Sequence, residues 1–183
     1  MIIASEKRKE NIAEYLLYMW QIEDMIRANG LDIEKIRANI IDRMTDLSEE
    51  QRRDMIDWYE SLIDMMRREG VAERGHLQIN RNVMSELVDL HRALVADPKF
   101  GEYGALFYRT LPYIVDLRSR AGEAAEGEIE TCFTALYGLL LLRLQGKEIS
   151  PETTTAISVI SKFIATLAAY FHKNEREPLF AKN

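Results

Sequence analysis

Length, composition and charge already exclude several classes of protein. The 183 residues are 47% hydrophobic and 30% charged, with one cysteine, 9 Gly and 4 Pro. These figures suit one compact domain and argue against a disordered chain, a collagen or a disulfide framework. With 24 Lys+Arg against 30 Asp+Glu the formal net charge is −6, so general attraction to nucleic acid or to an anionic membrane is not expected.

Helical periodicity dominates the chain, and no segment alternates convincingly with period two. Gly30 is typical of a position just past a helix end, whereas Asp32 and the capping-box residue Ser48 are typical of helix starts. Asp97-Pro98 and Ser150-Pro151 pair an N-cap residue with proline at the first helical position. We expect helices over residues 5–29, 32–44, 48–70, 78–96, 97–122, 125–145 and 150–173.

These elements predict an all-α, single-domain bundle of six to eight helices over residues 1–173, with a loose tail over 174–183. Pro112 lies inside the 97–122 helix, where we expect it to kink or split the helix. The 125–145 helix is apolar nearly all round. A helix of that kind is normally wrapped by others, so we expect it near the centre of the bundle.

The first expected helix carries apolar residues on two sides. Most of them form one stripe, but Leu17 and Trp20 fall well outside it, on the side that holds Asp24 and Arg27. This helix therefore touches more than one neighbour or contributes to a subunit interface. We take Leu17 and Trp20 as candidate interface residues of a homodimer.

A second hypothesis places a ligand pocket near the 97–122 helix and the end of the 125–145 helix. Tyr108 and Arg109 lie in an aromatic segment around Pro112, and Arg143 shares a helix side with apolar residues. Such side chains could bind a planar or anionic molecule. Ordinary packing, together with an arginine that suits the last turn of its helix, accounts for the same residues.

Catalytic and metal-binding patterns are not found in the sequence. His76, His91 and His172 are scattered, and none is paired at i+4 or in a Glu-x-x-His motif. We expect His91 to be a hydrogen-bonded histidine at the core edge and Cys132 to be a buried thiol without a nearby base. We therefore predict no catalytic residue, no metal site and no cofactor. An enzyme is the third hypothesis, after an interaction protein and a small-molecule binding module.

Nucleic-acid and membrane binding are disfavoured by local features as well. Residues 22–36 match a helix-turn-helix in outline, but Asp32 and Glu34 open the second helix where basic groups would meet phosphate. The N-terminus turns charged after four residues, unlike a signal peptide, and the apolar stretch 135–142 is far short of the ~20 residues that span a bilayer. We expect a cytoplasmic protein.

Two blocks of sequence resemble a known family. They are MIIASEKRKENIAEYLLYMWQIED at residues 1–24 and QGKEISPET at residues 145–153. They are similar to a family of uncharacterised, all-helical proteins of about this length from gut-type anaerobic bacteria, classed as a domain of unknown function. The resemblance extends over the chain and implies no activity, cofactor or catalytic residue. The leading hypothesis is thus a non-enzymatic interaction or scaffold protein that forms a homo-oligomer, and the alternative is a small-molecule binding module.

Overall fold

A computed structural model describes residues 2–121 and 127–180 of the chain. Within these ranges all regular secondary structure is helical, in eight α-helices and two short 3-10 helices, which confirms the all-α class. The residues group into two compact units. The first unit comprises residues 1–10 and 14–82, and the second comprises residues 11–13 and 83–183.

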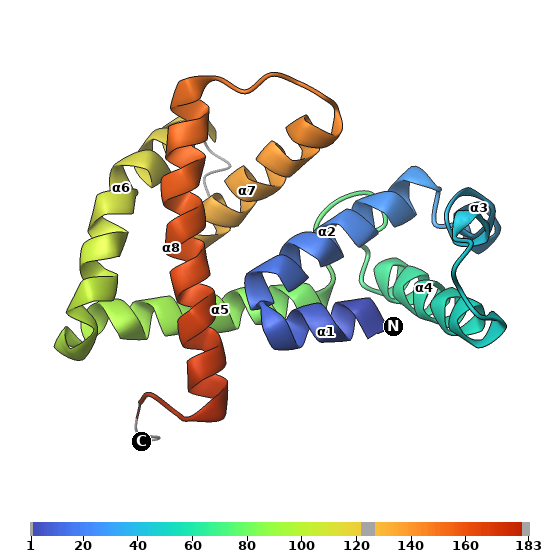
Figure 1. The fold of residues 1–183 in the computed structure, drawn as a ribbon, viewed down its shortest axis with the longest axis horizontal. Coiled ribbons are helices and arrows are strands. Elements are labelled where there is room, and N and C mark those ends of the chain that lie inside the picture. The colour runs from blue at the N-terminus through green and yellow to red at the C-terminus, as the bar shows by residue number, and fades with distance from the viewer. Residues whose placement is uncertain (1, 122–126, 181–183) are drawn as a thin grey trace. The chain divides into compact units, whose positions relative to one another are not determined.

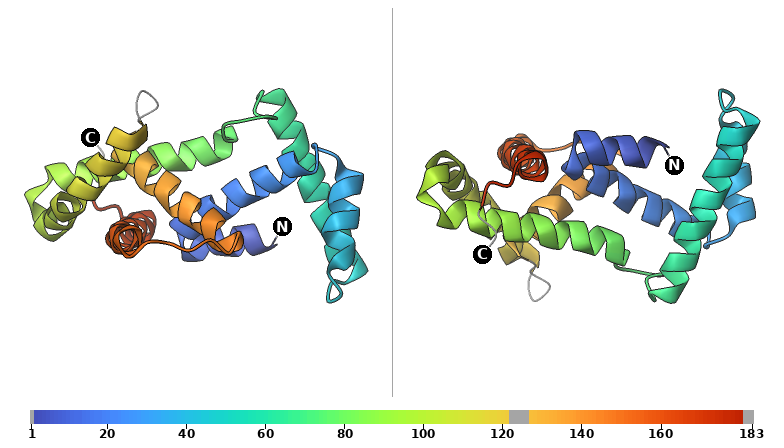
Figure 2. Two further views of the ribbon diagram at one scale, coloured as in Figure 1. Left: turned by 90° about the horizontal axis from the view of Figure 1, so that it is seen from above. Right: turned by 90° about the horizontal axis from the view of Figure 1, so that it is seen from below.

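The first unit begins with α1 (Ile2–Glu10) and most of α2 (Ile12–Ala28), followed by α3 (Ile33–Asn39), the 3-10 helix η1 (Ile41–Arg43) and α4 (Glu49–Arg68). α3 and α4 lie side by side (Figure 2). Two expected helix starts are confirmed. The carboxylate of Asp32 accepts a hydrogen bond from the Glu34 backbone N–H at 2.9 Å, and Ser48 and Gln51 form a reciprocal capping box.

The expected helix over 5–29 is divided at Asn11. The side-chain oxygen of Asn11 accepts from the Ala13 backbone N–H at 3.0 Å, so Asn11 caps a new helix. The backbone N–H of Ile12 donates to Nε2 of His172 at 3.0 Å. These two bonds satisfy amides at the start of α2 that a continuous helix would have directed to α1 carbonyls.

The second unit contains most of α5 (Gln78–Ala96), the 3-10 helix η2 (Pro98–Phe100), α6 (Gly101–Ala121), α7 (Glu128–Leu144) and α8 (Pro151–Arg176). α6 and α7 both pack on α8 (Figure 1). α6 runs through Pro112 as one helix, so of the expected kink or split the split does not occur. The expected helix end at Gly122 and start at Ala125 lie outside the described residues.

α8 is the main core helix of the second unit. It begins at the Ser150 cap, as expected. It buries seven residues, namely Ile157, Ile160, Phe163, Ile164, Leu167, Ala168 and Phe171. By length and composition α8 could also cross a membrane, a test that core helices of globular proteins pass as well.

The C-terminal end of α8 is more ordered than the tail expected from residue 174. The helix continues to Arg176. The side-chain oxygen of Asn174 then accepts from the Leu179 backbone N–H at 2.9 Å, and the Phe180 ring packs on Phe100 with centroids 5.4 Å apart. Residues 181–183 of the expected tail lie outside the described part of the chain.

Candidate functional site

The three residues proposed to bind a ligand lie on the surface of the second unit. The Tyr108 side chain is 62% exposed, and Arg109 and Arg143 are exposed as well. The neighbouring aromatics Tyr103 and Phe107 are instead buried against His91. None of the three predicted ligand residues lines the pocket between α5 and α8 or the pocket between the start of α3 and α4.

The two candidate interface residues have different surroundings. Leu17 is half-buried, whereas Trp20 is only 7% exposed. The Trp20 ring stacks on the His76 imidazole, with centroids 4.2 Å apart and planes 13° from parallel. An indole outside the main apolar stripe therefore has an aromatic partner within its own unit, and its position needs no second subunit to explain it.

Sequence reasoning missed the most buried polar group of the first unit, the Glu23 carboxylate. Glu23 is 0% exposed. It accepts from the Leu77 backbone N–H at 2.9 Å and the Asn80 side-chain amide at 2.7 Å, and His76 Nδ1 lies 2.6 Å from its second oxygen. A signal was available, because Glu23 is one helical turn from the stripe residues Met19 and Ile26.

Glu23 and its partners His76, Leu77 and Asn80, here called the Glu23 cluster, hold the segment between α4 and α5 in place. Arg27, one turn after Glu23, donates to the carbonyls of Val71 (3.1 Å) and Gly75. Glu69 accepts from the Gln78 backbone N–H at 2.6 Å. The first turn of α5 has no acidic residue of its own, so Glu23 and Glu69 supply the negative charge and the hydrogen-bond acceptors that a helix N-terminus favours.

The imidazole of His76 beside Glu23 has the geometry of a carboxylate-oriented base. No group of three or more His, Cys, Asp or Glu side chains able to hold a metal occurs among residues 2–121 and 127–180. The structural role of the cluster therefore accounts for its geometry.

Two further titratable groups belong to the core of the second unit, as expected. His91 Nδ1 lies 2.8 Å from the Tyr103 hydroxyl oxygen, and burial lowers the pKa of His91 below its usual 6.5. Cys132 is fully buried, and burial raises the pKa of its thiol to about 12. A thiol held in this neutral form is a poor nucleophile.

The largest departure from expectation concerns α7, which was predicted to be wrapped at the centre of the bundle. Its N-terminal half is indeed buried, through Ile129, Thr131, Cys132 and Phe133. In the C-terminal half Leu139 is buried, but Leu136, Leu140, Leu141 and Leu142 are only half-buried. Leu144 is 70% exposed. Figure 1 shows the reason, because the C-terminal end of α7 diverges from α8.

Gly138 lies in the middle of this poorly covered half of α7. Apart from its own helix backbone and adjacent residues, no atom lies within 4 Å of the position that an alanine Cβ would take. A glycine inside a helix costs about 0.8–1 kcal/mol relative to alanine. The packing around Gly138 gives no reason to retain a glycine there.

Comparison with known proteins identifies a family and no function. The model of a family described as "Domain of unknown function (DUF4924)" matches residues 1–178, so the chain belongs to that family. No curated protein and no solved structure shows a match.

Proposed function

We propose that this member of the DUF4924 family is a non-enzymatic interaction protein that self-associates through the C-terminal half of α7. The observation that carries the proposal is the set of incompletely buried leucines on either side of the buried Leu139, which ends at Leu144, 70% exposed. Apolar side chains left incompletely buried along one helix are typical of a protein–protein contact. The proposed contact surface is thus the C-terminal half of α7 rather than the surface around Leu17 and Trp20.

Gly138 supports a contact made by a helix. Small residues let two helix backbones approach closely, and the open Cβ position at Gly138 leaves room for such an approach. Within its own unit the glycine only weakens α7. A second helix crossing at Gly138 supplies a reason for the residue.

The charge pattern of α7 favours a second copy of the chain as the occupant. Between Thr131 and Leu142 the helix carries no Asp, Glu, Lys, Arg or His, and the exposed Arg143 follows directly, next to Leu144. Around Gly138 two such helices meet without like-charge repulsion, and a twofold arrangement in which they run antiparallel keeps the two Arg143 side chains apart. The proposed assembly is therefore a homodimer.

Gly138→Ala gives a test in which the stability of the fold should increase while the affinity of the dimer decreases. The methyl group enters open space in the chain itself, so α7 gains about 0.5–1 kcal/mol of helical stability. In the dimer the same methyl group lies between two helices. The dissociation constant of the dimer should therefore rise about tenfold or more, which corresponds to about 1.4 kcal/mol of binding free energy. Light scattering coupled to gel filtration measures mass against the 21.2 kDa of the monomer.

Gly104→Ala is the matched control, because Gly104 lies inside α6 and also has no atom near its Cβ position. It should stabilise the fold and leave the mass unchanged. Leu144→Glu, at an exposed position, should give a folded monomer. A wild-type protein that is monomeric at micromolar concentration, or an association equally insensitive to both glycine changes, would refute the proposal.

We also propose the source and the cellular location that the sequence predicts. The resemblance of residues 1–24 and 145–153 supports an origin in a gut-type anaerobic bacterium. The acidic composition and the single cysteine in 183 residues support a cytoplasmic location. Fractionation of cells that produce the native protein, with detection by antibody, tests the location.

A further inference from the structure

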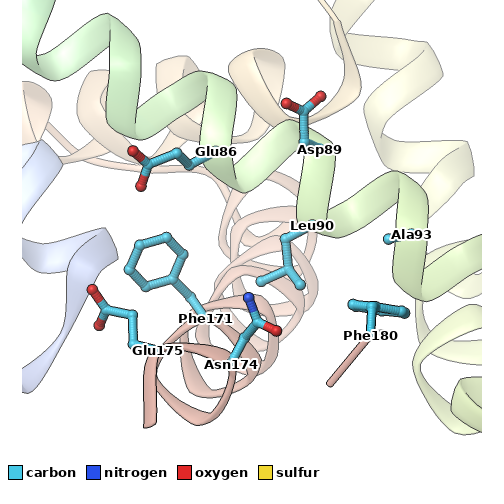
Figure 3. A pocket seen from close by; sticks show the side chains of 8 residues that line it. All are labelled: Glu86, Asp89, Leu90, Ala93, Phe171, Asn174, Glu175 and Phe180. Atoms are coloured by element: carbon cyan, nitrogen blue, oxygen red, sulfur yellow. The ribbon is translucent and has the colours of Figure 1, made fainter. Parts of the chain in front are cut away.

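A cavity of about 440 Å³ lies between α5 and α8 in the second unit. Figure 3 shows side chains from both helices and from the C-terminal segment around it. The lining residues are Glu86, Asp89, Leu90, Ala93, Phe171, Asn174, Glu175 and Phe180. The volume suits a small organic molecule.

Helical spacing and one backbone turn build the cavity. Glu86 and Leu90 follow each other at i and i+4 on α5, so they share one face, while the Asp89 carboxylate is directed away from Leu90 (Figure 3). On α8 the same spacing places Phe171 and Glu175 together. The bond from the Leu179 backbone N–H to Asn174 then folds the chain back, which brings the Phe180 ring to the cavity.

The lining combines an apolar surface with negative charge and contains no basic side chain. Leu90 and Phe171 are buried, whereas the carboxylates of Glu86, Asp89 and Glu175 are exposed. Among the described residues no basic group lies within ion-pair distance of Glu86. Asp89 is 3.9 Å from Arg92, and Glu175 is 3.0 Å from His172 Nδ1.

We propose that this cavity binds a small organic cation with an aliphatic body, of the alkyl-diamine class. Its ammonium groups would pair with the carboxylates, and its methylene chain would cover the Phe171 and Phe180 rings, whose faces also attract cations. A neutral apolar ligand would desolvate the carboxylates without pairing them, and an anion would be repelled. The charge of the ligand is thus opposite to that expected for a pocket formed by Arg109 and Arg143.

Titration with 1,5-diaminopentane, followed by NMR chemical shifts of the whole protein, tests the proposal. We expect saturable binding in the millimolar range that weakens with salt, and clearly weaker binding of 1,5-pentanediol, which has the same length without the charges. Glu86→Gln should weaken diamine binding about two- to fivefold. This variant should fold normally, because Glu86 is exposed and without an ion-pair partner among the described residues.

Glu102→Gln is the matched control, since Glu102 is an exposed carboxylate of α6 that does not line the cavity. It should leave the affinity unchanged. Three results would each overturn the proposal: no saturable binding of the diamine, equal binding of the diol, or equal losses in the Glu86 and Glu102 variants. The monomeric Leu144→Glu variant should bind the diamine like wild type, which keeps this test separate from that of self-association.

Discussion

Replacing Glu23 by alanine should destabilise the first unit by about 3–5 kcal/mol. The change leaves the Leu77 N–H and the Asn80 amide without their acceptor in a buried site, and each unpaired donor costs about 1–3 kcal/mol. His76 adds less, because its half-exposed ring can turn to water. Two unpaired donors together cost about 2–6 kcal/mol, a range that contains the expected loss.

Glu23→Gln separates the loss of charge from the loss of the acceptor. The amide oxygen of glutamine can still accept from Leu77 and Asn80, so only about 1–2 kcal/mol should be lost, as for a charge-assisted bond that becomes neutral. The order of stability should be wild type, then Glu23→Gln, then Glu23→Ala. The total stability of a domain is only about 5–15 kcal/mol, so the alanine variant should be studied at low temperature, where it is still folded.

Tryptophan fluorescence during urea unfolding reads this unit selectively. Both tryptophans of the chain, Trp20 and Trp58, lie in it, and Trp20 stacks on the His76 ring. Glu14→Gln is the control on the same helix, since the Glu14 side chain is 62% exposed and should change stability by less than about 1 kcal/mol. If Glu23→Ala costs no more than Glu14→Gln, the reasoning on the buried carboxylate is wrong.

Three other predictions concern the second unit. The Cys132 thiol should react with iodoacetamide only after unfolding, and rapid alkylation of the folded protein would contradict its burial and its pKa of about 12. Because the pKa of His91 is lowered in the folded state, the unfolded chain binds the proton first. The contribution of neutral His91 to folding stability should therefore be fully present above about pH 6.5 and decrease as pH falls below it. Urea midpoints from circular dichroism should show a smaller decrease in His91→Gln. Ser150→Ala should cost about 1 kcal/mol by removing the cap on Thr153, whereas Ser150→Thr should retain most of it in thermal melts.

The features predicted correctly are those that neighbouring residues determine. The caps at Asp32, Ser48 and Ser150 each depend on a side chain and a backbone N–H two or three residues apart, so a short stretch of sequence contains both partners. The burial of Cys132 and His91 followed from their places on apolar helix faces. The all-α class followed from periodicity over many residues, which averages out local exceptions.

The features that were missed depend on distant partners. The helix break at Asn11 is completed by His172, and the partner that accounts for Trp20 is His76, in an irregular connection. The apolar pattern of α7 shows which residues the helix can bury. The length over which α8 packs against α7 depends on the fold and cannot be deduced from that pattern. Glu86 reads as part of a solvated helix face until the turn after α8 places Phe180 near it.

The bond between the Ile12 amide and His172 has a consequence for the order in which the molecule can be completed. Its two partners are 160 positions apart, so α2 emerges from the ribosome long before the acceptor at its first turn has been translated. Contacts of such separation form late, because a long loop must close before they are made. A fragment that begins at Val83 would likewise carry a His172 whose natural donor is missing, although most of the second unit lies beyond that point.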